Sequence, residues 1–397
     1  MNMIFIKKGV LFVCLFGLCY LLQGCNRNSQ GNIVANPYKH IPTLNVKFDE
    51  LLTIGDTENN ALTDPTFVRL SEDGKVFIFD KGSMSVKVFD GTGKLLSEFG
   101  QRGRAPGEYL EMTCVLLGSS LVYIYDEFNK RVTVLDFKGV VIKTVRVTSL
   151  LWPRDMFVYK GNIIFLNKIP YYLSEASKMN NFLFHEFDSL FNYKTSFGEK
   201  SALLPKSKNG SYQDLKEEIQ PGTISRVNKE GNEFIYAPYF YEGKMYSFRA
   251  DTKKNWSNNK IIKNTLVNKL PVIEEASETT TTLKYHFGRD TKYGTVNTES
   301  LGVFTLKNGN IIHFIYTLID NKKRFIVELF DHTGRLLGYS TPDFLFLNNY
   351  KNYVKAISPA VIFSAKDKND HFYLIMFNNS KQGIVRIVKK VNISINR

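Results

Sequence analysis

Residues 76–99 read VFIFD-KGSM-SVKVFD-GTGK-LLSEF and decide the fold. Three short runs rich in Val, Ile and Phe are separated by polar turns, which predicts three antiparallel strands. The same pattern returns at residues 122–147 as VYIYD-EFNKR-VTVLD-FKG-VVIKTVRV. Because a unit that folds back on itself recurs along the chain, the sequence predicts a repeated β-meander.

A turn motif marks each repeat. Asp at the first position of a turn accepts backbone hydrogen bonds, and Gly at the fourth position supplies a positive φ. This motif begins at Asp90, Asp136 and Asp331, and weaker copies lie near Asp188 and Asp251. After Asp188, Asn192 is expected to take the place of Gly. The growing spacing between copies predicts insertions at residues 171–226 and 252–300.

Six apolar runs follow one another in the same order. The first two are VFIFD and VYIYD, and the others lie at residues 163–166, 234–237, 311–315 and 372–377. Strands are apolar on both faces only when both faces are covered, so we expect these runs to be the inner strands of radially stacked sheets. The sequence therefore predicts an all-β fold, a six-bladed β-propeller over residues 44–397. The last unit is short of a strand, and residues 44–54 are predicted to join it and close the ring.

The N-terminus carries an export signal. Lys7 and Lys8 precede an apolar run of 14 residues, Gly9 to Leu22, which is shorter than the roughly 20 residues that span a membrane. The run ends in LQGC at residues 22–25, which resembles the lipobox of bacterial lipoproteins and implies acylation of Cys25. Gln23 departs from the residues usual in a lipobox, so a plain secretory signal is the alternative.

These features predict a signal peptide at residues 1–24, a lipidated Cys25 and a polar, flexible tether over residues 25–43. The expected partner is the membrane, through the lipid anchor. The tether has no acidic cluster, which favours the periplasmic face of the outer membrane in the cell envelope. Cys114 is then the one cysteine of the folded part, so no disulfide and no Cys-based metal site is expected. We interpret it as a buried hydrophobe rather than a reactive thiol.

A glycine-rich loop, FGQRGRAPGEY, occupies residues 99–109. Its spacing matches neither dinucleotide nor P-loop motifs. It resembles the FG-x-x-G-x-G-P-G-E-[YF] crossover of the 6-bladed β-propeller lipoprotein family, which groups with NHL-like and TolB-like propellers of Gram-negative anaerobes. Ala105 departs from the usual Gly. The resemblance covers essentially the whole chain, is sharpest over residues 67–109, and implies a lipid-anchored propeller with no established reaction.

In such propellers this segment crosses one face of the disc. The resemblance makes four side chains candidate binding residues that would face the central opening: Arg102, Arg104, Glu108 and Tyr109. The alternative is an Arg–Glu pair that holds the loop together.

Other chemistry is weakly supported. The six histidines are scattered without metal-binding spacing, and no nucleophile motif appears, so no catalytic residue, metal or cofactor is predicted. Removing Lys7 and Lys8 lowers the formal charge of +14 by two, to +12, but export argues against nucleic acid as a partner.

Two functions stay open. The first is a non-enzymatic module that binds a protein, a peptide or a glycan. The second is an envelope hydrolase or lyase with a metal ion in the propeller channel.

Overall fold

The computed structural model describes residues 31–36, 41–57, 61–147, 153–167, 181–203, 222–227, 232–239, 241–253, 255–264, 273–275, 283–287, 290–296, 298–319, 322–342, 361–380 and 383–396. The predicted signal peptide and Cys25 lie outside these residues. No described helix is long and apolar enough to cross a membrane.

Residues 76–99 form three strands of the first sheet, blade 1. Its strands are β3 (Pro65–Leu70), β4 (Val76–Asp80), β5 (Ser85–Phe89) and β6 (Leu95–Phe99), paired antiparallel in this order. Every residue of β4 is buried. Phe77 and Phe79 pack towards the next sheet, whereas Val76 and Ile78 pack towards the last one. The continuous apolar run is therefore explained by neighbours on both faces.

Five further sheets follow. Blade 2 consists of β9 (Met112–Leu117), β10 (Leu121–Asp126), β11 (Arg131–Asp136) and β12 (Val141–Arg146). Blade 3 consists of β13 (Pro153–Tyr159), β14 (Asn162–Asn167), β15 (Phe182–Phe187) and β16 (Tyr193–Glu199). Blade 4 consists of β17 (Thr223–Arg226), β18 (Glu233–Ala237), β19 (Lys244–Ala250) and β20 (Trp256–Asn264), with β1 (Asn32–Asn36) added at its outer edge. Blade 5 consists of β24 (Thr298–Thr305), β25 (Ile311–Ile319), β26 (Lys322–Phe330) and β27 (Leu336–Ser340). Blade 6 consists of β28 (Val361–Lys366), β29 (Phe372–Ser380), β30 (Gly383–Asn396) and β2 (Asn45–Ile54).

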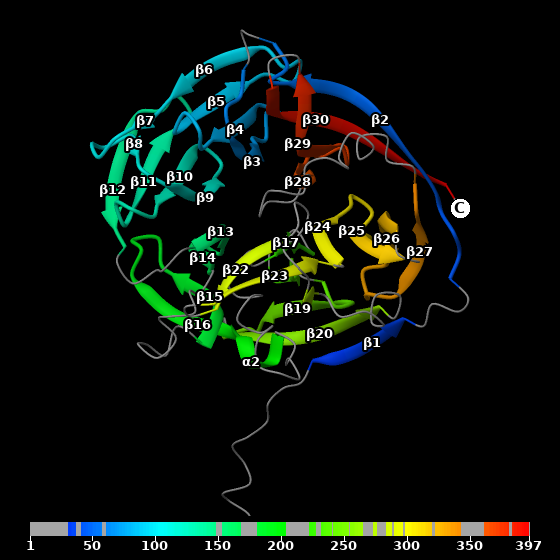
Figure 1. Ribbon diagram of the computed structural model, residues 1–397. Helices are drawn as coiled ribbons and strands as arrows, with labels where there is room; N and C mark the ends of the chain where they lie inside the picture. Colours follow the sequence, from blue (N-terminus) through cyan, green and yellow to red (C-terminus); the bar gives the residue numbers. More distant parts are fainter. Residues whose placement is uncertain are drawn as a thin grey trace, which may run out of the picture.

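The six sheets stand in a ring, as Figure 1 shows. The first strands of the blades face the axis, and β3 contacts β9 on one side and β28 on the other. The prediction that runs such as VFIFD are the innermost strands is wrong, because they are the second strands. The innermost strand β3 is less apolar than β4, because its unpaired edge borders the axis and four of its six residues stay partly exposed.

A buried apolar cluster fills the seam between each pair of neighbouring blades in the described part of the chain. In the seam between blades 3 and 4, Phe184 lies 5.1 Å from Phe234 in an edge-on arrangement. Burial of one large apolar side chain contributes about 1.5–3 kcal/mol. The seams therefore hold the ring together without any disulfide among the described residues.

The N-terminal segments pair with sheets that are distant in sequence. β2 runs antiparallel to β30, with Val46 opposite Ile395 and Ile54 opposite Val388. β1 runs parallel to β20, inside the segment for which the sequence predicts a flexible tether. The buried Asn36 side chain helps to hold β1 in place. Its Nδ2 donates to the Gly334 carbonyl at 3.0 Å, and its Oδ1 accepts from the Leu336 N–H at 2.8 Å.

The aspartate turns are present as predicted. Asp136 Oδ1 accepts the N–H groups of Lys138 and Val140, at 2.9 and 2.8 Å, and Gly139 has φ of 85°. In the turn that begins at Asp188, however, the left-handed residue is Phe191, with φ of 66°, and not Asn192. Phe191 accepts this conformation because its ring is buried in the seam between blades 2 and 3.

The connections differ between the two ends of the blades. In a four-stranded meander, the turns after the first and third strands lie at one end, and those after the second and fourth strands at the other. Blades 1, 2 and 5 have tight turns at the first end, whereas the long connections lie at the other. One of these, between blades 4 and 5, contains a sheet of β21 (Ile273–Glu275), β22 (Leu283–Phe287) and β23 (Asp290–Val296).

The insertions predicted at residues 171–226 and 252–300 are therefore too wide. They include the blade strands β15, β16, β17 and β20, together with the short helix α2 (Lys200–Leu203). β16 and β20 carry many exposed or half-buried polar residues because they lie near the rim. In the sequence, strands this polar cannot be distinguished from inserted loops.

Candidate functional site

The glycine-rich loop lies at the rim of the disc and not at the central opening. It follows β6, the outermost strand of blade 1, and forms a short parallel pair of β7 (Gln101–Arg102) and β8 (Glu108–Tyr109) (Figure 1). Gly107 approaches Val141 of the outermost strand of blade 2. The chain does cross here from the outermost strand of blade 1 to the innermost strand of blade 2, β9. The expectation that the loop faces the channel is wrong, because Gly107 lies against the outermost strand of blade 2.

The loop holds itself together through Glu108. Its Oε2 accepts the N–H of Ala105 at 2.9 Å, and its Oε1 accepts Gln101 Nε2 at 2.8 Å. The Ala105 hydrogen bond, with that from Gln101, lowers the pKa of Glu108. Neither Arg102 nor Arg104, both of which are described and exposed, forms an ion pair with this carboxylate.

The arginine that does hold the loop is Arg131 of blade 2. Its guanidinium donates to the carbonyl oxygens of Arg104, Ala105 and Glu108, each at 2.7 Å. Tyr109 is fully buried between blades 1 and 2, where its ring contacts Gly100. A ligand cannot reach it, so its role is packing.

A pocket lies elsewhere, in the seam between blades 5 and 6. Its volume is about 330 Å³, at the lower end of the range typical of ligand pockets. Its apolar wall consists of Leu306, Ile312, Leu329, Phe372, Ile393 and Ile395, and its polar lining of Asn308, Asn310 and Asp370. We call it the seam pocket.

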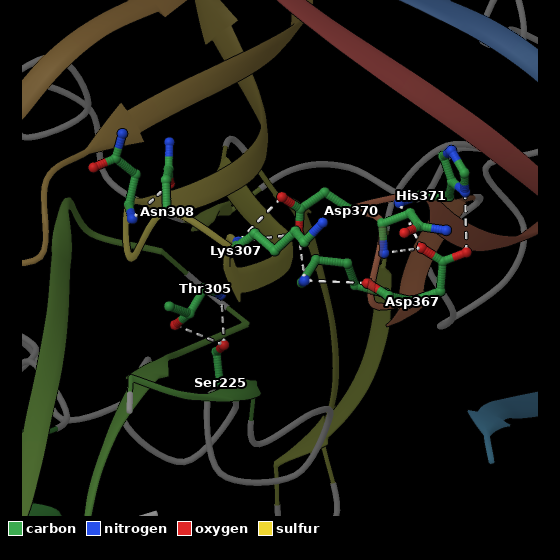
Figure 2. Close-up of polar contacts among 10 residues, drawn as sticks. Ser225, Thr305, Lys307, Asn308, Asp367, Asp370 and His371 are labelled. Atoms are coloured by element: carbon green, nitrogen blue, oxygen red, sulfur yellow. Dashed lines mark hydrogen bonds and ion pairs between the residues drawn. The ribbon is translucent and has the colours of Figure 1, made fainter. Parts of the chain in front are cut away.

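Two hairpin turns form the mouth of the seam pocket. The first, Leu306 to Asn310, belongs to blade 5, and the second, Asp367 to His371, belongs to blade 6. Figure 2 shows the two turns side by side, joined by Asp370. Asp370 accepts the Lys307 N–H at 3.2 Å through Oδ1 and at 3.1 Å through Oδ2. Lys366 Nζ, 2.5 Å from Oδ1, compensates its charge.

Asp370 adopts a left-handed backbone conformation, with φ of 63°. The equivalent residues in the hairpins of blades 1 and 5 are Gly74 and Gly309, with φ of 88° and 84°. A non-glycine residue is strained in this conformation, although Asp tolerates it better than most. The side chain of Asp370 therefore has a use that outweighs this strain, which is the bond across the seam.

A second carboxylate, Asp367, stabilises the blade 6 turn by accepting hydrogen bonds within it. Asp367 accepts the N–H groups of Asn369 and His371, and its Oδ2 lies 3.0 Å from His371 Nδ1 and 3.2 Å from Lys390 Nζ (Figure 2). Burial raises the pKa of Asp367, but the backbone hydrogen bonds from His371 and Asn369 outweigh it and leave the pKa below its usual value.

The Asn side chains at the mouth retain free hydrogen-bonding capacity. Asn308 Oδ1 accepts the N–H of Asn310 at 3.0 Å. Among the described residues, neither Asn308 Nδ2 nor the Asn310 side chain has a hydrogen-bond partner. An amide can both donate and accept, so these groups match a ligand that carries hydroxyl groups.

A serine, a histidine and a glutamate are linked across three strands of blade 5. Ser300 Oγ lies 2.9 Å from His313 Nε2, and His313 Nδ1 lies 3.1 Å from Glu328 Oε2. This is the order of groups in a hydrolase triad. Ser300 is only 2 % exposed, however, and both partners are fully buried, so no substrate reaches the hydroxyl.

The described residues also contain no group of three or more His, Cys, Asp or Glu residues arranged to hold a metal ion. Near the axis, Arg69 of blade 1 pairs with Asp155 of blade 3 at 2.8 Å, and Ser225 of blade 4 accepts the Thr305 N–H of blade 5 at 2.8 Å. These bonds tie the innermost strands of the blades to one another.

Residues 43–344 match the model of the DUF5128 family, described as a 6-bladed beta-propeller. The chain belongs to this family.

Two solved structures resemble this DUF5128 propeller along most of its length. An exported protein of Bacteroides fragilis is 14 % identical, with 91 % of this chain and 99 % of that chain covered and a TM-score of 0.51. A member of the DUF4221 family from Bacteroides vulgatus is 10 % identical, with 88 % and 99 % covered and a TM-score of 0.53. At such identities the likeness concerns the fold. No curated protein matches the chain.

The family match ends before β28, so the blade 6 wall of the seam pocket lies beyond it. Sequence reasoning missed the pocket of this DUF5128 propeller. Its residues come from three distant segments, at 306–329, 370–372 and 393–395, which meet only in the closed ring. The visible signals, NGN at 308–310 and ND at 369–370, predict turns and nothing more.

Proposed function

We propose that this DUF5128 propeller is a non-enzymatic binding protein of the cell envelope that holds a neutral saccharide unit in the seam pocket. The observation that carries the proposal is a pair of amides, Asn308 with a free Nδ2 and Asn310 with a free side chain among the described residues, above an apolar wall. Sugar rings present hydroxyl groups at the edge and C–H groups on the face, so they need both kinds of surface.

Charge favours a neutral ligand over an ionic one. Asp370 is the acidic group of the pocket lining, and Lys366 and the Lys307 N–H already satisfy it. An amine or a guanidinium would compete with Lys366 for this carboxylate. Hydroxyl groups can bind the amides without breaking the existing bonds.

The proposed cellular location rests on the N-terminal sequence. We propose that residues 1–24 direct export, that Cys25 is acylated, and that the propeller is held at the periplasmic face of the outer membrane. Acylation with more than one chain gives stable membrane attachment. Labelling with a fatty-acid analogue should be lost in Cys25→Ala, and a label that persists would overturn this assignment.

Calorimetric titration of the purified full chain with a panel of neutral oligosaccharides tests the pocket. The double variant Asn308→Ala with Asn310→Ala is expected to weaken binding roughly tenfold or more, because each lost hydrogen bond costs about 1 kcal/mol.

Asp73 and Lys75 occupy the equivalent turn positions in blade 1, where Asp73 pairs with Lys75. Asp73→Ala with Lys75→Ala is therefore the matched control and should leave binding unchanged. Equal weakening by both double variants, or no binding by any saccharide, would contradict the proposal.

The enzyme alternative has one supporting feature, the linked Ser300, His313 and Glu328. The burial of these three residues disfavours the enzyme alternative, and the described residues contain no cluster of side chains that could hold a metal ion. Ser300→Ala tests the alternative directly. Loss of a hydrolytic activity in this variant, with an unchanged unfolding curve, would replace the binding proposal with a catalytic one.

A further inference from the structure

Five of the eight exposed large apolar side chains of the described residues lie on the rim of blades 2 to 4, and the other three are Leu51, Leu96 and Phe128. Exposed apolar side chains gather there: Val140 (60 % exposed) and Ile142 (56 %) on blade 2, Leu190 (66 %) and Tyr193 (45 %) on blade 3, and Ile33 (56 %) on the β1 edge of blade 4. We call this set the apolar rim. Soluble proteins seldom expose such side chains in a connected group unless the surface is used.

The blade 2 and blade 3 parts of the apolar rim are contiguous. Lys143 Nζ, from β12, donates to the carbonyl of Ser189 in the blade 3 turn at 3.3 Å. The same ammonium lies 5.9 Å from the centre of the Phe191 ring. Leu190 stands between these two turn residues, so it is adjacent to the outer strand of blade 2.

The charges that face outwards from this rim are mainly positive. Lys138, Lys194 and Lys253 are exposed in or beside the turns that carry it. The acidic residues of the same turns, Asp136, Asp188 and Asp251, accept main-chain N–H groups of their own turns. The excess of positive charge comes from the outer strands, where Arg146 is exposed and Lys143 and Lys263 are partly exposed. Lysines beside apolar side chains match a surface of anionic headgroups over acyl chains.

The chain itself brings this rim close to the proposed anchor. The N-terminal segment at the edge of blade 4 is described from Gly31, and Cys25 precedes it by only six positions. Six extended residues span at most about 20 Å. A domain of this length has a radius of gyration of about 20 Å and is roughly 50 Å across. With Cys25 in the membrane, the β1 edge of blade 4 must stay within about 20 Å of it. An orientation in which the rim opposite blade 4 contacts the membrane is therefore excluded.

From these observations we infer that the propeller stands edge-on at the membrane, with the apolar rim of blades 2 to 4 docked on anionic phospholipid. The inference rests on the proposed acylation of Cys25 and adds the orientation of the ring and the chemistry of the lipid surface. The axis of the disc then lies along the membrane plane, and both ends of the blades remain open to the periplasm.

The opposite rim provides a matched control. Blade 6 lies across the ring from blade 3 (Figure 1). Its outermost strand β2 exposes Leu51 (49 %), which follows the exposed residues Asp49 and Glu50 in the sequence. Leu51 is thus about as exposed as Tyr193. Glu50 pairs with Lys389 at 2.5 Å, and Lys47 and Asp49 are both exposed, so this rim lacks the positive excess of the apolar rim.

The test places a fluorophore on a single introduced cysteine in the acylated full chain. Ile142→Cys and Tyr193→Cys report on the apolar rim, and Leu51→Cys reports on the opposite rim; Cys114 is buried and does not interfere. The protein is reconstituted in vesicles of phosphatidylethanolamine and phosphatidylglycerol that contain a headgroup-nitroxide lipid. We expect several-fold stronger quenching at positions 142 and 193 than at position 51.

Two further measurements test whether charge drives the docking. The difference should shrink when Lys138→Glu and Lys194→Glu are added, and also in about 1 M salt, where the Debye length falls to about 3 Å. Equal quenching at all three positions, on a protein that carries the acyl label, would overturn the edge-on orientation and leave the anchor standing. Absence of the acyl label from Cys25 would overturn the anchor and with it this inference.

Discussion

Asp370 of blade 6 accepts the main-chain N–H of Lys307 in blade 5, with 3.1 Å between Oδ2 and the nitrogen. This bond joins the two hairpins at the mouth of the seam pocket. It comes from a residue in a left-handed conformation that glycine would adopt at lower cost. The geometry of the mouth therefore depends on one carboxylate.

Substitution of Asp370 should separate the cost of its backbone conformation from the value of its bond. Asp370→Ala loses the bond and keeps the strain, so we expect a loss of about 1 kcal/mol or more in the free energy of unfolding. Asp370→Gly loses the bond but relieves the strain, by about 1 kcal/mol, and should be close to neutral. Denaturant unfolding of the two variants measures this. An Asp370→Gly variant as unstable as Asp370→Ala would show that the conformation costs nothing.

Three glycines distinguish backbone strain from crowding. Gly91 has no positive φ, and a Cβ added there would meet no atom within 4 Å, so Gly91→Ala should lie within about 0.5 kcal/mol of the parent. Gly74 has φ of 88° but open space, so Gly74→Ala should cost about 1–2 kcal/mol. Gly139 has φ of 85°, and a Cβ there would lie 2.4 Å from the Phe99 ring, which adds about 1–3 kcal/mol. Thermal unfolding should rank the variants in this order, and any other order would contradict this explanation.

Deletion of β2 should destabilise the whole ring. The strand supplies the partner of β30, and its Val46 and Ile54 are buried in the two seams on either side of blade 6. Loss of these groups and of the strand pairing amounts to several kcal/mol, a large part of a typical stability of about 5–15 kcal/mol. We expect a single cooperative transition at a clearly lower temperature by circular dichroism. Deletion of Asn32–Asn36, which removes an added edge strand, should have a smaller effect. An unchanged melting temperature after removal of β2 would refute its role in closing the ring.

The buried Glu328 should make stability depend on pH in the direction opposite to Asp367. Burial raises the pKa of Glu328, and this outweighs the opposing effect of its hydrogen bond to His313. A raised folded-state pKa means that the contribution of Glu328 is fully present below its unfolded pKa and is lost as the pH rises through the folded value. Glu328→Gln should therefore gain stability relative to the parent as the pH is raised from acid to neutral.

Asp367 provides the comparison, because its folded pKa is lowered. Its contribution is present above the unfolded pKa and is lost as the pH falls through the folded value. Asp367→Asn should thus cost more at neutral pH than in acid. Denaturant unfolding at several pH values measures both variants, and slopes of the same sign would contradict the assignment.

Much of the fold could be predicted because it depends on local patterns. VFIFD and its counterparts are apolar along their whole length since seams cover both faces, and this leaves a signal in single strands. The aspartate turns leave a signal because one side chain closes its own turn. A ring of six blades then follows from counting the apolar runs.

The parts that could not be predicted depend on what a strand faces. The innermost strand PTFVRL borders the axis and is half-exposed, so it lacks the apolar pattern of its neighbour. Phe191 adopts a left-handed conformation because the adjacent blade buries its ring, which no local rule contains. The resemblance to a crossover predicts that the glycine-rich loop faces the channel, whereas the hydrogen bonds of Arg131 keep it at the rim.

The wall of the seam pocket includes Ile393 and Ile395, which lie on β30 opposite Phe48 and Val46 of β2. Any molecule that binds there contacts the strand on which the two ends of the propeller chain meet. By mass action, a ligand with this contact favours the closed circle over an opened one, by an amount that grows with the logarithm of its concentration above Kd. Occupancy would therefore prolong the lifetime of the protein against proteases, so that the abundance of the protein would rise with the supply of such a ligand.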